Sequence, residues 1–370
     1  MEFKVNTKDL DKVLNQLSSV LPSKTIMEII QHFLLTLKDN LLTVYATDMN
    51  VAYQKTLPVF SDGEIQVAVP GKLFNDTISS LPDTDIKITF HPDEKKCVIH
   101  TDTGKYSLGY VDPFEFPKFP QVEEKLTFKI NGERLKEAFT VTEFACSDEE
   151  QRPAMRGILM DLKKDKLIFV STDGHRLVKL SYEDYQPEIE AQLIIPAKSA
   201  EQLTKILDEK DVQVTVGEKI VKFEFDGGVF MTRLIDDTYP NYESVIPLDN
   251  DNVMKISRTE LLQTLRRASF YIHSKARRID LEISKDMLSL TAENPELGTQ
   301  MNEKILCEYS GEPLQVAFKH DFITEVLEHI HSDEVFFKFS SPIRPCIIEP
   351  VEQKDNENLL VLIMPMRINV

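Results

Sequence analysis

Apolar residues follow two patterns along this chain, and the same succession of the two patterns occurs three times. First, apolar and polar residues alternate, which predicts a half-buried strand. Then apolar residues recur three and four positions apart, which predicts one face of a helix. The alternating positions are Met1, Phe3, Val5, then Leu126, Phe128, Ile130, then Met254, Ile256, and the helical stripes are Leu10, Val13, Leu14, Leu17, then Leu135, Ala138, Phe139, Thr142, then Leu261, Thr264, Leu265, Ala268.

Each of the three segments continues with further strands and a second helix. Strands are expected at 41–45, 167–170 and 287–290, and again at 65–69, 192–195 and 314–318 before the second helix. The second helical stripes are Phe74, Thr77, Ile78, Leu81, then Ala200, Leu203, Thr204, Leu207, then Ile323, Val326, Leu327, Ile330. More strands are expected at 85–90, 212–216 and 334–339.

The repeats have a constant length and matching helix starts. Leu10, Leu135 and Leu261 begin equivalent stripes, about 125 residues apart, whereas solenoid repeats usually span about 20–50 residues. Asn6 and Asn131 can cap the first helices of their segments, and Ser257 with Glu260 resembles a capping box. We therefore predict an α+β fold of three repeated domains at 1–122, 123–249 and 250–370, each with two helices backed by antiparallel sheets.

Composition restricts the class of protein. Apolar residues make up 42% and charged residues 28% of the 370 positions, as in ordinary globular proteins. The N-terminal residues lack the pattern of an export signal. The four cysteines are scattered, with no CxxC pair, so we expect reduced thiols in a cytosolic protein and no metal site or cofactor. The net charge of −18 argues against tight phosphate binding by the surface as a whole, but not against a local basic face.

The last residues of the chain admit two interpretations. Leu359 to Ile363 is a continuous apolar run that predicts a buried strand. Pro365 should end that strand, because proline has no backbone donor. The tail from Met364 to Arg367 is then either a short end beyond a core strand or one wall of a hydrophobic partner pocket, since methionine suits surfaces that accept apolar guests.

The hexapeptide Thr172-Asp173-Gly174-His175-Arg176-Leu177 is the strongest candidate for chemistry. Asp173 and His175 could serve as an acid–base pair or as metal ligands, in a hydrolase or transferase. No serine or cysteine nucleophile motif and no third ligand at metal spacing accompanies them. His329 and His331 form a second His-x-His pair, which we interpret as surface histidines at the end of a helix.

Taken with the threefold repeat and the terminal Met364-Pro365-Met366-Arg367, this hexapeptide makes the whole chain resemble the bacterial DNA sliding clamps, the β subunits of DNA polymerase III. The resemblance implies a homodimer in which two chains associate head to tail into a closed ring of six domains, with helices around a central hole. Such a ring encircles double-stranded DNA independently of sequence and tethers the replicative polymerase. It has no catalytic activity, needs no cofactor, acts in the cytoplasm without a membrane, and is placed on DNA by a clamp-loader ATPase.

The same resemblance implies a hydrophobic cleft that receives short linear motifs from the polymerase, the clamp loader and repair proteins. An apolar cleft with a few polar groups suits an extended peptide. Two positions differ from the family pattern: Pro345 stands where a small polar residue is common, and Asn369 and Val370 extend beyond the usual last apolar position, Ile368. The implied cleft residues are Met155, Thr172, Gly174, His175, Arg176, Leu177, Pro240, Val245, Pro345, Leu362, Ile363, Met364, Pro365, Met366 and Arg367.

The resemblance also implies contacts to DNA and between the two chains. DNA contacts should be made to phosphates, so binding should be independent of sequence and sensitive to salt. The dimer contact should join Tyr106 and Leu108 of one chain to Tyr271 and Ile272 of the other. The candidate DNA-binding residues are Lys24, Lys72, Arg152, Arg156, Lys198, Lys275, Arg277, Arg278 and Lys319.

Three functions are therefore compared. A DNA-encircling clamp predicts a dimer that is retained on circular but not on linear DNA. A hydrolase or transferase predicts that His175→Ala abolishes a turnover. A three-domain scaffold that binds proteins without encircling DNA predicts no topological retention.

Overall fold

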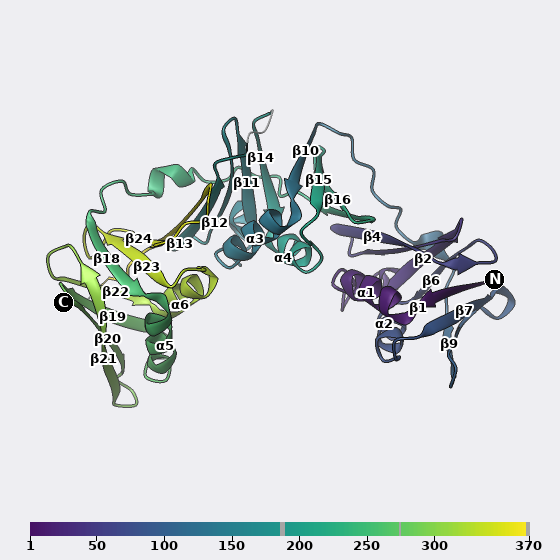
Figure 1. Cartoon of the computed structure of the whole chain (residues 1–370), viewed down its shortest axis with the longest axis horizontal. Helices are drawn as coiled ribbons and strands as arrows, with labels where there is room; N and C mark the ends of the chain where they lie inside the picture. The colour runs from purple at the N-terminus through teal and green to yellow at the C-terminus, as the bar shows by residue number, and fades with distance from the viewer. Residues whose placement is uncertain (186–188, 274, 368–370) are drawn as a thin grey trace. The chain divides into compact units, whose positions relative to one another are not determined.

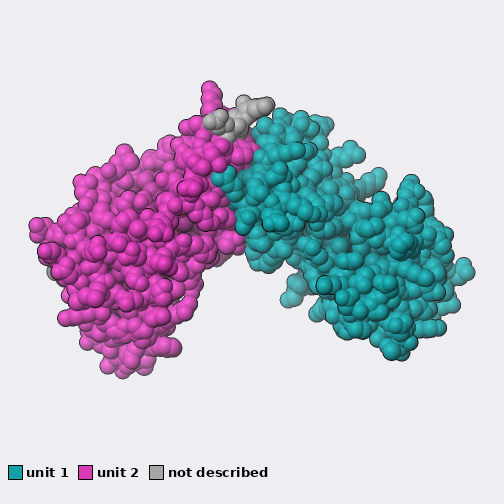
Figure 2. Space-filling view, in the orientation of Figure 1, with its two compact units in different colours: residues 1–136, 201–234 teal, residues 137–200, 235–370 magenta. Residues whose placement is uncertain are grey.

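A computed structural model describes residues 1–185, 189–273 and 275–367. This part of the chain contains 25 strands and six α-helices. It divides into two compact units, which Figure 2 distinguishes by colour. Unit 1 comprises residues 1–136 and 201–234, and unit 2 comprises residues 137–200 and 235–370. Each unit is described by itself.

Unit 1 contains two antiparallel sheets. Five strands form one sheet in the order β5-β1-β7-β8-β9, and eight form the other in the order β10-β15-β16-β17-β4-β3-β2-β6. The second sheet therefore joins strands of the first repeat to strands of the middle repeat through the pairing of β17 with β4. The strands are β1 (Glu2–Asn6), β2 (His32–Lys38), β3 (Leu41–Thr47), β4 (Val51–Pro58), β5 (Phe60–Ser61), β6 (Ile65–Pro70), β7 (Asp85–His91), β8 (Lys96–His100), β9 (Lys105–Gly109), β10 (Leu126–Asn131), β15 (Asp211–Val216), β16 (Ile220–Phe225) and β17 (Gly228–Arg233).

Unit 2 contains one antiparallel sheet of twelve strands. Their order is β14-β11-β12-β13-β25-β24-β23-β18-β21-β20-β19-β22. Here the middle repeat meets the last repeat where β13 pairs with β25. The strands are β11 (Gly157–Lys163), β12 (Lys166–Thr172), β13 (Arg176–Tyr182), β14 (Ala191–Pro196), β18 (Asn252–Ser257), β19 (Arg278–Ser284), β20 (Met287–Asn294), β21 (Thr299–Tyr309), β22 (Leu314–Lys319), β23 (Glu334–Phe339), β24 (Cys346–Pro350) and β25 (Glu357–Ile363).

All six predicted helices are present, and their predicted stripes face the core. Helices α1 and α2 pack side by side in unit 1, as do α5 and α6 in unit 2 (Figure 1). Leu10, Leu14 and Leu17 are buried on α1, and Leu261 and Leu265 are buried on α5. The helices are α1 (Thr7–Ser18), α2 (Gly71–Ser79), α3 (Gly132–Glu143), α4 (Ala197–Thr204), α5 (Arg258–Ala268) and α6 (His320–His329), of which α3 and α4 have residues in both units.

The predicted helix caps are also confirmed. The Asn6 side chain accepts a hydrogen bond from the backbone N–H of Lys8, and Ser257 accepts one from that of Glu260. Asn131 Oδ1 accepts from the backbone N–H groups of Glu133 (3.0 Å) and Arg134 (3.3 Å). These bonds satisfy donors that the first turn of a helix otherwise leaves unused.

The two places where neighbouring repeats share a sheet have the same construction. We call the β4–β17 pairing in unit 1 the first junction and the β13–β25 pairing in unit 2 the second junction. Ala52 lies opposite Met231 at the first junction, and Leu177 lies opposite Leu362 at the second. In both, a strand from the first half of one repeat is paired with the last strand of the next repeat along the chain.

The state of the cysteines and the length of the helices can be compared with the expectations from the sequence. All four cysteines are free thiols, and burial raises the pKa of Cys97 to about 12 and that of Cys307 to about 11. Such thiols are poor nucleophiles and poor metal ligands at neutral pH. No helix among residues 1–185, 189–273 and 275–367 is long and apolar enough to span a membrane.

Candidate peptide-binding site

The turn from Thr172 to Arg176 joins β12 to β13 and is held by its own side chains. Asp173 Oδ1 accepts hydrogen bonds from the backbone N–H groups of His175 (2.8 Å) and Arg176 (2.9 Å). Thr172 Oγ1 accepts from Gly174 N (3.0 Å) and donates to Arg176 O (2.7 Å). Gly174 has φ +88°, which glycine adopts without strain. Asp173 thus organises the turn, so the structure does not favour the acid–base interpretation of Asp173 and His175.

Arg176 was expected on the surface of the cleft, but its head group points inward. The residue is only 8% exposed. Its guanidinium bonds Asp173 Oδ2 (3.1 Å), Glu325 on α6, and the carbonyl of Phe144 (2.6 Å) beyond the end of α3. It also lies over the rings of Phe144 (5.1 Å) and Phe322 (4.7 Å). Arg176 therefore ties the turn to elements of both repeats, and this side chain supports the site from beneath.

The tail that follows β25 is fixed to this turn. Met364 N donates to the carbonyl of His175 (2.8 Å), and Met366 N donates to that of Ala317 within β22 (2.7 Å). Met364 is 38% exposed, Pro365 and Met366 are half-buried, and Arg367 is exposed. The tail is thus an ordered apolar edge beside the turn. Ile368, Asn369 and Val370 lie outside the described residues.

Three of the predicted cleft side chains lie beneath the surface. Leu177, Leu362 and Ile363 are almost fully buried. Leu177 and Leu362 belong to an apolar cluster with Val170 and Tyr239. Both faces of β13 are buried at the junction, so alternation along the strand does not turn these residues outward. They form the floor of the site, and the surface itself comes from their neighbours.

The segment from Tyr239 to Val245 borders the site, and its tyrosines anchor it. Tyr239 OH donates to Val170 O (3.3 Å), and Tyr242 OH donates to Asp161 Oδ2 (2.9 Å). Burial is the largest cause of the raised pKa of both phenols, so both remain neutral donors. Pro240 and Val245, the two predicted residues, are exposed between and beyond these anchors. The anchored segment can therefore present apolar side chains without a core of its own.

The remaining predicted residues fall at the margins. Met155 is half-buried on the short turn before β11, and its carbonyl accepts from Ser147 N (2.8 Å). Pro345 is half-buried before β24, and its carbonyl accepts from Asn250 Nδ2 (2.9 Å). All the predicted cleft residues belong to unit 2, where the turn, the tail and the tyrosine segment surround one apolar cluster.

Sequence reasoning missed the contribution of α6. Phe322 stacks on His175, with ring centroids 6.2 Å apart, and Lys319 Nζ lies 4.6 Å from the centre of the same ring. Phe322 directly precedes Ile323, the first residue of the helical stripe, and so lay just outside the core pattern. A large aromatic residue beside a stripe was the available signal, but only the fold shows that it meets His175.

The candidate DNA-binding cations differ in their exposure and in the contacts that they make. Lys24, Lys72, Arg156, Lys198 and Lys275 are exposed. Arg277 bonds Asp321 and Arg278 bonds Asp280, so these two guanidinium groups already have carboxylate partners. Arg152 is exposed but pairs with Glu149 (3.2 Å), and Lys319 covers Phe322. Ser274, beside Lys275, lies outside the described residues.

Two of the four candidate dimer residues are buried and two are exposed. Leu108 and Ile272 are buried within their own units, with Ile272 6% exposed in the core of unit 2, and their contact with a partner stays a prediction. Tyr106 is exposed on β9, which is an edge strand of its sheet, and Tyr271 is partly exposed after α5. Phe270, beside Tyr271, is 82% exposed and was not predicted.

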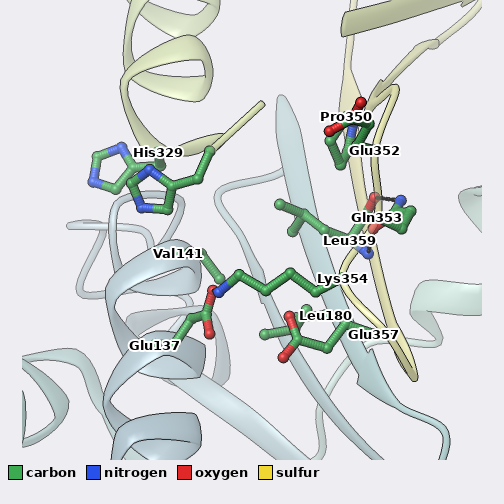
Figure 3. Close-up of a pocket in the computed structure, with 11 residues that line it drawn as sticks. Glu137, Val141, Leu180, His329, Pro350, Glu352, Gln353, Lys354, Glu357 and Leu359 are labelled. Carbon is green, nitrogen blue, oxygen red and sulfur yellow. Dashed lines mark hydrogen bonds and ion pairs between the residues drawn. The ribbon is translucent and has the colours of Figure 1, made fainter. Parts of the chain in front are cut away.

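A separate pocket lies near α3 at the second junction (Figure 3). It encloses about 370 Å³, counting its open mouth. Lys354 reaches across it to bond Glu137 on α3, and the Gln353 side chain bonds the backbone of Leu359 (2.9 Å). His329 at its edge is not a free surface histidine, because it stacks on Phe144 with centroids 4.4 Å apart. No cluster of three or more potential metal ligands occurs in the described part of the chain.

Comparison with known proteins gives one consistent result. Models of the DNA polymerase III beta subunit match the N-terminal domain at residues 1–120, the central domain at 129–241 and the C-terminal domain at 243–367. The beta sliding clamp of Staphylococcus aureus is 27% identical over 380 residues, covering 99% of each chain. That of Chlamydia trachomatis is 27% identical over 374 residues, covering 100% of this chain and 88% of the relative.

Solved structures agree. A sliding clamp from Pseudomonas aeruginosa bound to griselimycin has a TM-score of 0.92 at 26% identity, and both chains are covered completely. The DNA polymerase III beta subunit from Thermotoga maritima also has a TM-score of 0.92, at 25% identity and complete coverage. These matches confirm the three-domain α+β architecture, although they do not test the individual site residues.

Proposed function

The chain belongs to the DNA polymerase III beta subunit family, the bacterial sliding clamps, and on that premise we propose that two copies form a ring that encircles duplex DNA. The family consists of processivity factors without catalytic activity, which favours this function over both an enzyme and a simple scaffold. The observation that carries our proposal is the fixed pairing of the Thr172–Arg176 turn with the Met364–Met366 tail in unit 2. A polymerase tethered there would remain on DNA for as long as the ring stays closed.

Topological retention tests the ring directly. The chain is loaded with a clamp-loader ATPase onto nicked circular DNA, one half of the sample is linearised, and both halves are passed through a sizing column in high salt. Retention only on the circle supports encirclement, because salt removes phosphate contacts but not linkage. Equal retention on both DNAs contradicts encirclement, and no retention on either favours the protein-binding scaffold.

We propose that the dimer contact joins the exposed edge of β9, including Tyr106, to the patch formed by Phe270 and Tyr271 of the second chain. An unpaired strand edge invites pairing, and a head-to-tail contact that repeats twice closes a ring. Light scattering should give a mass near twice 42.5 kDa. Phe270→Glu should lower it toward the monomer, whereas Phe114→Glu, at a phenylalanine 93% exposed in unit 1, should not.

For DNA, we propose phosphate contacts from cations such as Lys24, Arg156 and Lys275, for which the described residues supply no carboxylate in an ion pair. Each phosphate contact adds about 0.9 to the slope of log affinity against log salt concentration. Lys275→Ala should therefore reduce the slope by about one. Arg278→Ala, in the same segment but paired with Asp280, should leave the slope unchanged. An equal effect of both changes would contradict this division.

We propose that the turn, the tail and the tyrosine segment of unit 2 bind short apolar motifs of the polymerase, the clamp loader and repair proteins. The buried floor of Leu177 and Leu362, the partly exposed Met364 and the exposed Val245 support this. Relatives from Pseudomonas aeruginosa and Bartonella birtlesii have been solved with griselimycin bound. We expect griselimycin to compete here with a labelled peptide of the glutamine-leucine-x-leucine-phenylalanine type. We also propose domain boundaries at 1–122, 123–249 and 250–370, and a cytoplasmic location, where replicating DNA lies.

A further inference from the structure

The turn between β3 and β4 in unit 1 repeats the hydrogen bonds of the partner-site turn in unit 2. Thr47 Oγ1 accepts from Met49 N (3.0 Å) and donates to Val51 O (2.7 Å). Asp48 Oδ1 accepts from the backbone N–H groups of Asn50 (3.0 Å) and Val51 (2.8 Å). The same four bonds link Thr172 and Asp173 to the residues after them.

The partner strand beside each turn is also anchored to the turn in the same way. Arg233 N, at the end of β17, donates to the carbonyl of Asn50 (3.0 Å), as Met364 N, just after β25, donates to that of His175. Met49 has φ +77° where Gly174 has φ +88°. A methionine rarely adopts this conformation, and such strain is concentrated at functional positions. The first junction therefore holds a second copy of the partner-site framework.

The side chains on this framework leave a pocket at the first junction. Its cavity volume is about 80 Å³, above the roughly 10–15 Å³ that one water needs and below the about 300–1,000 Å³ of whole-ligand pockets, so it suits a single side chain. Ala52 occupies the position that Leu177 fills at the second junction, so space remains above the buried Met231. The lining residues used below are Met49, Ala52, Pro120, Ile220, Met231 and Arg233.

One uncompensated charge borders this pocket. The Arg233 side chain is exposed, and its Nε donates only a long hydrogen bond to Met49 O (3.4 Å). Among the residues that the structure describes, no carboxylate forms an ion pair with Arg233. The nearest acid in the turn, Asp48, uses Oδ1 for the backbone. On a chain of net charge −18, a lone arginine above an apolar floor is complementary to an apolar group that carries a carboxylate.

We propose that the first junction is a second docking site, which takes a linear peptide with an apolar side chain followed by a carboxylate. The apolar side chain enters between Ala52, Ile220 and Met231, and the carboxylate pairs with Arg233. DNA is a poorer occupant, because a phosphate backbone needs several cations and gains nothing from an apolar floor. This proposal goes beyond the partner site of unit 2 and rests on residues of unit 1 alone.

Methionine methyl NMR on the full-length protein separates the two sites in one experiment. Met49 and Met231 report on the first junction, and Met364 and Met366 report on the partner site. The probe is acetyl-Leu-Phe-Asp-Asp-amide, and acetyl-Leu-Phe-Asn-Asn-amide is its uncharged control. We expect the acidic peptide to shift the Met49 and Met231 signals until they saturate. Its dissociation constant should be at least about tenfold lower than that of the control peptide, which corresponds to about 1.4 kcal/mol of binding free energy.

Two variants make the expectation specific. Arg233→Gln, at an exposed position, should weaken acidic-peptide binding about tenfold, as expected for the loss of one charge-assisted bond. Arg266→Gln, at an exposed arginine on α5, should not. Ala52→Leu should fill the pocket and abolish the Met49 shift, provided that the other methionine signals keep their positions.

Several results would overturn the proposal. These are an unchanged Met49 signal at saturating peptide, an equal response to both peptides, and an affinity that Arg233→Gln leaves unaltered. A Met49 shift caused by duplex DNA alone, or by raising the protein concentration without peptide, would assign the surface to another occupant and reject the peptide. A glutamine-leucine-x-leucine-phenylalanine peptide that leaves Met364 unmoved would count against the partner site only, so the two failures are distinguishable.

Discussion

The two junctions use one backbone design with different chemistry. At the second junction, Arg176 follows the turn, and its guanidinium connects Asp173, Glu325 and two phenylalanine rings. At the first junction, Val51 holds the equivalent place, is buried, and makes no polar side-chain bond. The comparison teaches that the hydrogen-bonded turn and the strand pairing form the joint between repeats. The side chains added to that joint determine whether it becomes a rigid partner site.

The polar contacts are distributed differently on the helix side of each junction. In unit 1, Lys55 is buried on β4 and bonds Gln16 Oε1 (3.2 Å) on α1, with Asp226 3.7 Å away. In unit 2, Leu180 on β13 is apolar, and the polar contact is instead made by the exposed Lys354 with the half-buried Glu137 (Figure 3). The first junction therefore carries a buried charge beneath its strand, and the second carries its buried charge at the turn.

The largest expected effect is that of Arg176→Ala. It removes a buried guanidinium and leaves Asp173 and the Phe144 carbonyl without their partner. We expect a loss of about 3 kcal/mol in the unfolding free energy of unit 2, at the lower end of the range for a broken buried pair because Glu325 is partly exposed. Urea unfolding measures the loss, and hydrogen exchange along β13 and β25 locates it. Arg267→Ala, whose partner Glu303 is near the surface, should cost less than about 1 kcal/mol.

Exchanging the residues at the tips of the two turns should have a smaller effect on stability. Gly174→Met and Met49→Gly should change stability in opposite directions. Gly174→Met places a side chain at φ +88°, and even its Cβ would lie 3.0 Å from Arg152 Nη1. We expect it to destabilise the fold by about 1–3 kcal/mol. Met49→Gly removes the same strain at φ +77°, so it should be neutral or stabilise the fold by up to about 1 kcal/mol. Thermal unfolding of both variants measures this. A destabilising Met49→Gly would show that the methionine side chain contributes more than its backbone costs.

The smallest expected effect is the contribution of Asp226 to the pH dependence of stability. The hydrogen bond from Lys210 is the largest cause of the lowered pKa of Asp226, with Lys55 adding to it. A carboxyl with a lowered folded pKa stabilises the fold above its unfolded pKa and loses that contribution as pH falls through its folded pKa. Asp226→Asn should therefore reduce stability at about pH 7 and reduce it progressively less toward about pH 2, as the native carboxyl becomes protonated. Urea midpoints at the two pH values test this, and an equal deficit at both would exclude the linkage.

Much of the fold follows from local pattern. The six stripes predicted the six helices because each helix buries one face on a sheet, and Asn6, Asn131 and Ser257 cap as their chemistry predicts. The motif Thr172–Leu177 and the tail were also placed correctly beside each other, although by family resemblance. Nothing in their local sequences indicates that Met364 N bonds His175 O.

Other features have physical causes that the local sequence does not show. Leu177, Ile363 and Arg176 were expected to line the cleft, but the structure buries the last three residues of β25 and all of β13 except Lys179. Of the predicted dimer residues, Tyr106 and Tyr271 are exposed, whereas Leu108 and Ile272 are buried in the single chain. The positive φ of Met49 was beyond local prediction, because no propensity favours it in methionine.

The most direct test of the partner site is fluorescence anisotropy with a labelled glutamine-leucine-x-leucine-phenylalanine peptide. The full chain is compared with a chain truncated after Ile363, which keeps all of β25 but removes the tail that Met364 and Met366 fix to the turn. We predict micromolar binding to the full chain and at least a tenfold loss, about 1.4 kcal/mol, on truncation. Equal affinity for the two chains, with β25 intact by hydrogen exchange, would contradict the assignment of this surface as the partner site.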